Sequence, residues 1–156
     1  MTVTRQENSA KQILEQKRAR HALEMVNEVK EKYPEGSENR KNFVSYVEGL
    51  PAAILNNGLG QAAATLLAQA GKEKDDPHRM VYNILEDWLC RDDRTAPYKR
   101  IGGGSEPRLI TEIVNGDRAS YIKAQVEALS YLEWLKKFTV AFLKEPEMCE
   151  EGEMEG

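Results

Sequence analysis

The segment YIKAQVEALSYLEWLKKFTVAFL, residues 121–143, carries the clearest helical pattern in the chain. An α-helix turns by about 100° per residue, so residues three or four apart lie on the same side. On this spacing most of the surface is apolar and a narrow polar wedge remains. The apolar set is Tyr121, Ala124, Ala128, Tyr131, Leu132, Trp134, Leu135, Phe138 and Phe142, and the wedge is Lys123, Glu127, Ser130, Glu133, Lys137 and Lys144. The pattern predicts a long C-terminal helix at the centre of a bundle.

The rest of the chain also shows helical periodicity, and no alternating run between hairpin turns predicts strands. The expected helices cover residues 8–33, 37–50, 51–71, 76–91, 105–116 and 117–145. Ser37 and Asp76 are typical N-cap residues, and Pro51 suits the first turn of the third helix. We therefore predict an all-α, single-domain bundle of about six helices over residues 1–144, followed by an acidic tail at residues 145–156.

The net charge is a sum over unlike parts. The chain has 156 residues with 22 Lys+Arg and 26 Asp+Glu, a balance of −4 that argues on its face against a nucleic-acid partner. Six of the glutamates lie in residues 145–156, however, and without them 20 acids face 22 bases. The acidic balance therefore does not exclude RNA, and the small positive remainder does not by itself predict RNA binding.

The sequence favours a cytoplasmic protein that does not enter the membrane. Cys90 and Cys149 are 59 positions apart without a CxxC motif, so neither a disulfide framework nor a zinc site is indicated. The N-terminus lacks the pattern of a secretory signal. Residues 49–71 carry no charge, but Pro51, several amides and glycines favour a buried helix of a bundle over a membrane span.

No constellation of residues predicts an enzyme, a cofactor or a metal site. His21 and His78 are the only histidines, and each stands among charged residues in a context typical of the protein surface. Neither has a serine or cysteine nearby that it could activate. The glycines at 102–104 lack the Lys and Ser/Thr of a P-loop and follow no strand, so they predict a loop between helices.

Three segments together resemble a known family. They are RKNFVSYVEGLPAAILNNGLGQAAATLLA at residues 40–68, VYNILEDWL at residues 81–89, and the C-terminal segment at residues 121–143. The first resembles a basic-aromatic helix, an LP turn and an NGLGQ-type helix, and the last a cluster of the form WLK-basic-Phe. In order and spacing, over residues 20–144, they are similar to the small subunit of the type III-B CRISPR RNA-silencing complex, the Cmr complex.

This resemblance implies a non-catalytic subunit of a ribonucleoprotein in antiviral defence. Such a subunit helps to bind the guide RNA (crRNA) and to capture complementary target RNA. The implied partners are the backbone and large subunits of the complex, further copies of the chain stacked in a minor filament, and the two RNAs. Cleavage metals and nucleotide chemistry would belong to other subunits.

Candidate RNA-binding residues follow from the need to neutralise phosphates along one face. They are Lys17, Arg18 and Arg20 on the first helix, Arg40 and Lys41 on the second, and Lys123, Lys136 and Lys137 on the last. Arg40 and Lys41 match the family's basic pair, although Glu48 stands where a base is often seen. We expect recognition of A-form shape and backbone without sequence readout. The alternative is a helical adaptor that contacts only protein.

The segment Asn57-Gly58-Leu59 matches the family's NGL core. We interpret it as structural, because a glycine at this point lets a facing helix approach closely.

Overall fold

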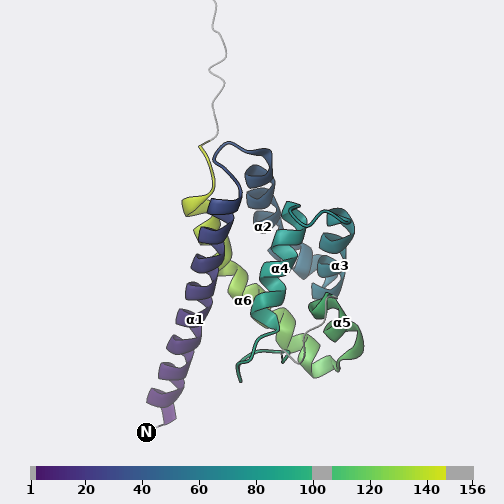
Figure 1. Cartoon of the computed structure of the whole chain (residues 1–156). Coiled ribbons are helices and arrows are strands. Elements are labelled where there is room, and N and C mark those ends of the chain that lie inside the picture. The colour runs from purple at the N-terminus through teal and green to yellow at the C-terminus, as the bar shows by residue number, and fades with distance from the viewer. Residues whose placement is uncertain (1–2, 100–106, 147–156) are drawn as a thin grey trace, which may run out of the picture.

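A computed structural model describes residues 3–99 and 107–146, and within them the chain is all-α. The helices are α1 (Val3–Lys32), α2 (Glu38–Asn57), α3 (Leu59–Ala70), α4 (Pro77–Leu89), α5 (Arg108–Asn115) and α6 (Arg118–Phe142). An isolated bridge between Cys90 and Tyr98 is the one β-type pairing in these two ranges. The predicted all-α bundle of six helices is confirmed (Figure 1).

α6 is the central helix, as its sequence pattern predicts. It contacts α1, α2, α3 and α4, and in Figure 1 it runs diagonally behind α4 toward the upper end of α1. Its buried apolar side chains are Ala124, Ala128, Tyr131, Leu132 and Leu135. Val26 of α1, Phe43 and Ile54 of α2 and Leu85 of α4 complete the core around it. Full burial of each valine, leucine, isoleucine or phenylalanine in this core contributes about 1.5–3 kcal/mol to stability.

Local capping signals place the starts of two helices correctly. The side chain of Ser37 accepts a hydrogen bond from the amide of Arg40 at 3.3 Å, and Asp76 accepts one from the amide of His78 at 2.7 Å. Both bonds satisfy donors that a helix N-terminus leaves free. The predicted N-caps are therefore confirmed.

The predicted break at Pro51 is wrong, because Pro51 lies inside α2 and the break comes at Gly58. Val47 and Leu50, before the proline, and Ile54, after it, are buried on the same face of α2. The burial of these side chains outweighs the roughly 3 kcal/mol that an interior proline costs. Gly58 has φ +85° and ψ 158°, a conformation essentially restricted to glycine. This backbone conformation ends α2 and starts α3.

Tyr121 and Gln125 of α6 hold the start of α3. The amide of Gly60 donates to the Tyr121 hydroxyl at 3.1 Å, and the amide of Leu59 donates to Gln125 Oε1 at 3.0 Å. A Cβ atom on Gly58 would lie 2.9 Å from the Tyr121 hydroxyl. Gly58 therefore lets α6 approach, which is the structural role that we expect of the NGL segment.

The last two boundaries differ from the sequence-based expectation. α5 starts after Pro107, and the expected start at Ser105 lies outside the described residues. α6 ends at Phe142, three residues before the expected end at Glu145. The division between a domain at residues 1–144 and a tail stays a prediction, because residues 147–156 lie outside the described ranges. No helix in the described part is both long and apolar enough to cross a bilayer.

Candidate nucleic-acid interface

One stripe of α6 faces solvent along most of the helix. Its members are exposed and recur at helical spacing: Ile122, Val126, Glu133, Lys136, Lys137 and Val140. We call this set the outer stripe. The N-terminal half is apolar, since Ile122 is 50% and Val126 60% exposed, and the C-terminal half carries the two lysines. The outer stripe therefore has an apolar end and a basic end.

The polar wedge predicted for α6 is wrong at Glu127, which is buried and faces α1. Its carboxylate accepts hydrogen bonds from Arg18 Nε and Nη2, both at 2.8 Å, and from Trp88 Nε1 at 3.0 Å. Three donors from α1 and α4 thus compensate the burial of the charge. The sequence analysis also missed that Ile122 and Val126 are exposed. The signal for this was that both aliphatic residues lie beside the polar wedge on the helical spacing.

The cations of α1 divide into paired and unpaired ones. Arg18 is engaged by Glu127 and Glu15, and the hydrogen bond to Glu127 is the main cause that raises its pKa. Lys17 Nζ lies 3.0 Å from Asp93 Oδ2. Hydrogen bonds from Thr95 first, and from Lys17 second, hold the pKa of Asp93 well below its usual value. Arg20 is exposed and has no hydrogen bond or ion pair with another residue in the described ranges.

The two cations of α2 have different surroundings. Arg40 is 6% exposed and donates from Nη2 to the carbonyl of Phe142 at 3.3 Å, so it caps the C-terminus of α6. Its Nε has no hydrogen-bond partner among the described residues. Lys41, the next residue, is exposed and makes no ion pair within residues 3–99 and 107–146.

α2 and α6 run antiparallel, which brings Lys41 near the basic end of the outer stripe. The Arg40–Phe142 bond joins the start of α2 to the end of α6, and the Leu59–Gln125 bond joins the first residue of α3, just beyond the end of α2, to the N-terminal half of α6. Lys123 lies 13 residues before Lys136, about 20 Å away along the axis. The structure thus places Lys136 and Lys137 at the basic end of the outer stripe and Lys41 at the start of α2, which meets the C-terminus of α6, and it separates Lys123 from Lys136 and Lys137.

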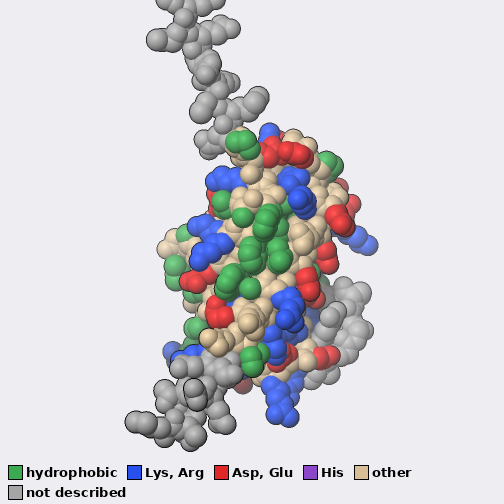
Figure 2. Space-filling view, turned by 90° about the vertical axis from the view of Figure 1, so that its left-hand side faces the viewer, with side chains coloured by type: hydrophobic (Ala, Val, Ile, Leu, Met, Phe, Trp, Pro, Cys, Tyr) green, Lys and Arg blue, Asp and Glu red, His purple; other side chains and the backbone are tan. Residues whose placement is uncertain are grey.

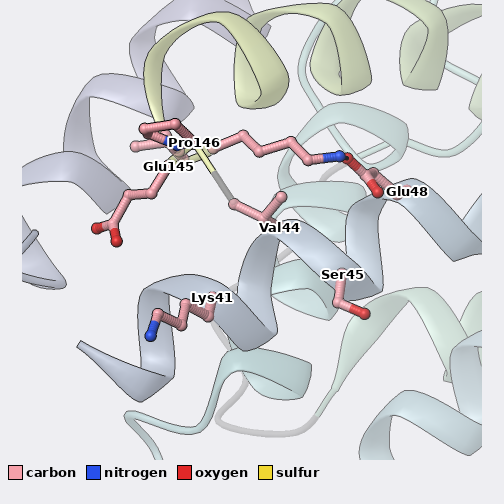
Figure 3. A pocket seen from close by; sticks show the side chains of 8 residues that line it. Lys41, Val44, Ser45, Glu48, Glu145 and Pro146 are labelled. Carbon is pink, nitrogen blue, oxygen red and sulfur yellow. Dashed lines mark hydrogen bonds and ion pairs between the residues drawn. The ribbon is translucent and has the colours of Figure 1, made fainter. Parts of the chain in front are cut away.

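A pocket of 530 Å³ lies between α2 and the chain that follows α6 (Figure 3). Its lining includes Lys41, Val44 and Ser45 from α2 and Lys144 and Pro146 from the other side. The ion pair between Lys144 and Glu48, 2.8 Å long, closes one side, and Figure 3 shows Lys41 at the opposite side. Lys41 therefore forms part of the wall of this pocket.

The side of the molecule where α1 lies mixes apolar and basic groups. Trp134, Phe138 and Phe142 form a ladder along α6 with ring centroids 5.7 and 6.2 Å apart, and Trp134 Nε1 donates to Glu15 of α1. Figure 2 looks onto this side and shows hydrophobic side chains gathered in the middle, with Lys and Arg side chains to the left and right of them. The ladder joins α1 to α6 and is only partly covered.

The interpretation of both histidines as ordinary surface residues is wrong. His21 Nε2 lies 2.6 Å from Asp87 Oδ2, and His21 Nδ1 lies 2.6 Å from the hydroxyl of Tyr131. His78 stacks on Tyr46 with ring centroids 3.8 Å apart. Sequence reasoning missed these contacts because the partners of His21 are 66 and 110 positions away.

The Asp87–His21–Tyr131 arrangement has the connectivity of a proton relay, but its last member is sealed. Tyr131 has no exposed surface, and burial raises its pKa well above the usual value. A substrate cannot reach the hydroxyl, so the arrangement serves the packing of α1, α4 and α6. In the described part of the chain no three His, Cys, Asp or Glu side chains are grouped so that they could hold a metal ion.

Comparison with protein families adds one finding. The family model of the CRISPR-associated protein Cas_Cmr5 matches residues 14–142 of the chain. The match begins in α1 and ends at the last residue of α6, so it includes part or all of each of the six helices.

Proposed function

The chain belongs to the Cas_Cmr5 family, the small subunits of the CRISPR type III-B Cmr complex, and from this premise we propose that it helps this complex to hold guide–target RNA. Family membership makes the other subunits of the Cmr complex its partners. In the proposal the chain is non-catalytic, acts in the cytoplasm, and contacts the RNA backbone through Lys41, Lys136 and Lys137.

The observation that carries the proposal is a set of exposed cations without ion pairs, two at the basic end of the outer stripe and one at the start of α2. Lys41, Lys136 and Lys137 are exposed and make no ion pair among the described residues, in contrast to Lys17 and Arg18. Such ammonium groups are free to replace the counterions of RNA phosphates. We place Arg20 and Lys123 at the margin of this surface, and we give Arg18 and Arg40 the role of holding the fold.

Replacing Lys136 and Lys137 together by alanine is expected to weaken capture of target RNA by the assembled complex roughly tenfold. Each phosphate contact that is lost lowers the dependence of log K on log salt by about one unit, so the slope falls by about two. Filter binding of labelled target RNA at several salt concentrations measures both quantities. Lys41→Ala alone is expected to give half of the change in slope.

The matched control is the double change Lys72→Ala and Lys74→Ala, which removes the same charge from exposed lysines between α3 and α4. It is expected to leave the affinity nearly unchanged. Equal affinity and equal slope in the wild-type, Lys136/Lys137 and control complexes would show that these lysines do not contact RNA. The chain would then be a helical adaptor that contacts only protein.

We further propose that copies of the chain stack into a minor filament through the apolar end of the outer stripe. Ile122 and Val126 are one turn apart and 50% and 60% exposed, so they form a contiguous apolar pair that a second copy would cover. Ile122→Asp with Val126→Asp is expected to reduce the number of copies per complex to one, seen by native mass spectrometry. The free energy of unfolding of the isolated variant should differ from that of the wild type by no more than about 0.5 kcal/mol, because both sites are on the surface.

Val114→Asp is the control for this prediction, because Val114 is 74% exposed but lies on α5. It should leave the copy number unchanged. An unchanged copy number in the Ile122/Val126 variant would rule out this end of α6 as the stacking surface.

A further inference from the structure

The described chain ends at Pro146, which forms part of the wall of the pocket between α2 and α6. Figure 3 shows Pro146 beside Glu145 on one side of the pocket, and Val44 and Lys41, one turn apart on α2, on the other. The ten residues that follow, EMCEEGEMEG, contain five glutamates and no base. A strongly acidic segment therefore begins directly beside the pocket.

The carboxylates already present around the pocket have partners. Glu48 pairs with Lys144, and Glu145 accepts a hydrogen bond from the amide of Gly36. The cations of the first turns of α2 do not have such partners: within the described residues neither Lys41 nor Arg40 contacts a carboxylate, and the buried Nε of Arg40 lacks an acceptor. Among the charged side chains that line the pocket, Lys41 is therefore the one without an ion-pair or hydrogen-bond partner in the described residues.

We propose that the acidic tail, residues 147–156, binds back along α2 in this pocket, with its glutamates next to Lys41. Charge complementarity supports this occupant, and so does its length. Ten extended residues span at most about 35 Å, and α2 with its 20 residues is about 30 Å long. The tail would occupy Lys41, so it would compete with RNA there; this second step rests on the proposed function, whereas the binding of the tail does not.

A nitroxide label on a Gly156→Cys change, in a chain that also carries Cys149→Ser, tests the binding of the tail in the full chain, because Cys90, the remaining native cysteine, is buried. The amide signal of Ser45, which lines the pocket, is expected to lose intensity with the native tail. It should recover when the glutamates at 147, 150, 151, 153 and 155 are replaced by glutamine. Lys41→Gln should also restore the signal, and the control Lys74→Gln should not. Equal Ser45 intensity with the native and the glutamine tail would overturn the proposal.

The competition is tested separately in the assembled complex. At low salt the glutamine tail is expected to strengthen capture of target RNA severalfold, and the gain should vanish at high salt, where charges are screened. If the label weakens the Ser45 signal but the glutamine tail gives no gain in RNA affinity, the tail binds in the pocket but does not compete with RNA. Since the label experiment contains no RNA, it stands even if the RNA contact through Lys136 and Lys137 fails its own test.

Discussion

Glu127→Ala is expected to lower the free energy of unfolding by about 3–5 kcal/mol, because it removes one partner of a buried ion pair. Glu127 receives two hydrogen bonds from Arg18 and one from Trp88, and its side chain and that of Arg18 are nearly covered. Without Glu127 the guanidinium of Arg18 has only the exposed Glu15 as an ion-pair partner, and the indole N–H of Trp88 loses its acceptor. Urea denaturation followed by circular dichroism measures the loss.

Glu133→Ala is the matched control, since Glu133 is an exposed glutamate of the same helix. Its effect should stay within about 0.5 kcal/mol. Replacing Arg18 by methionine and Glu127 by leucine together should cost much less than Glu127→Ala alone, because no buried charge is left unpaired. A Glu127→Ala protein as stable as the Glu133→Ala protein would show that the Arg18–Glu127 pair does not hold α1 to α6.

Gly58→Ala is expected to cost about 2–4 kcal/mol, the second largest effect. The conformation of Gly58 strains any residue with a side chain by about 1–3 kcal/mol. The new methyl group would also meet the Tyr121 hydroxyl at 2.9 Å and displace it from the amide of Gly60, a hydrogen bond worth about 0.5–1.5 kcal/mol. The shift in the urea midpoint at constant slope gives the loss.

Gly49→Ala supplies the control for this substitution within α2. Gly49 is helical, and a Cβ atom there meets no atom within 4 Å. Alanine should therefore stabilise the helix by about 0.5–1 kcal/mol. Opposite signs for the two glycines are the expected pattern, and a stabilising Gly58→Ala would contradict the account of the α2–α3 junction.

Local signals in the sequence predict what depends on neighbouring residues. Helical spacing identifies the buried face of α6, and Ser37 and Asp76 mark helix starts because a cap acts within three residues. Pro51 shows the limit of such signals. Its breaking tendency is local, whereas the burial of Leu50 and Ile54 that overcomes it comes from other helices.

The sequence predicts which cations could form the candidate site, but it does not predict which of them are engaged in ion pairs. Lys136 and Lys137 lie on the exposed side of α6, and of the two only Lys137 belongs to the polar wedge that helical spacing predicts. Arg18 and Arg20 look alike in sequence, yet within the described residues only Arg18 meets carboxylates, and the buried one, Glu127, is 109 positions away. Long-range partners of this kind decide which cations remain available for RNA.

Cross-linking of RNA to protein in the assembled complex tests directly whether Lys41, Lys136 and Lys137 contact RNA. Ultraviolet cross-linking of bound guide and target RNA, followed by mass spectrometry, is expected to identify peptides of this chain that contain Lys136 and Lys137, and a second site at Lys41. Peptides that contain Arg18 should not be cross-linked, because its guanidinium is engaged by Glu127. Cross-links found on other subunits alone, in a complex that contains this chain, would contradict the proposed RNA contact.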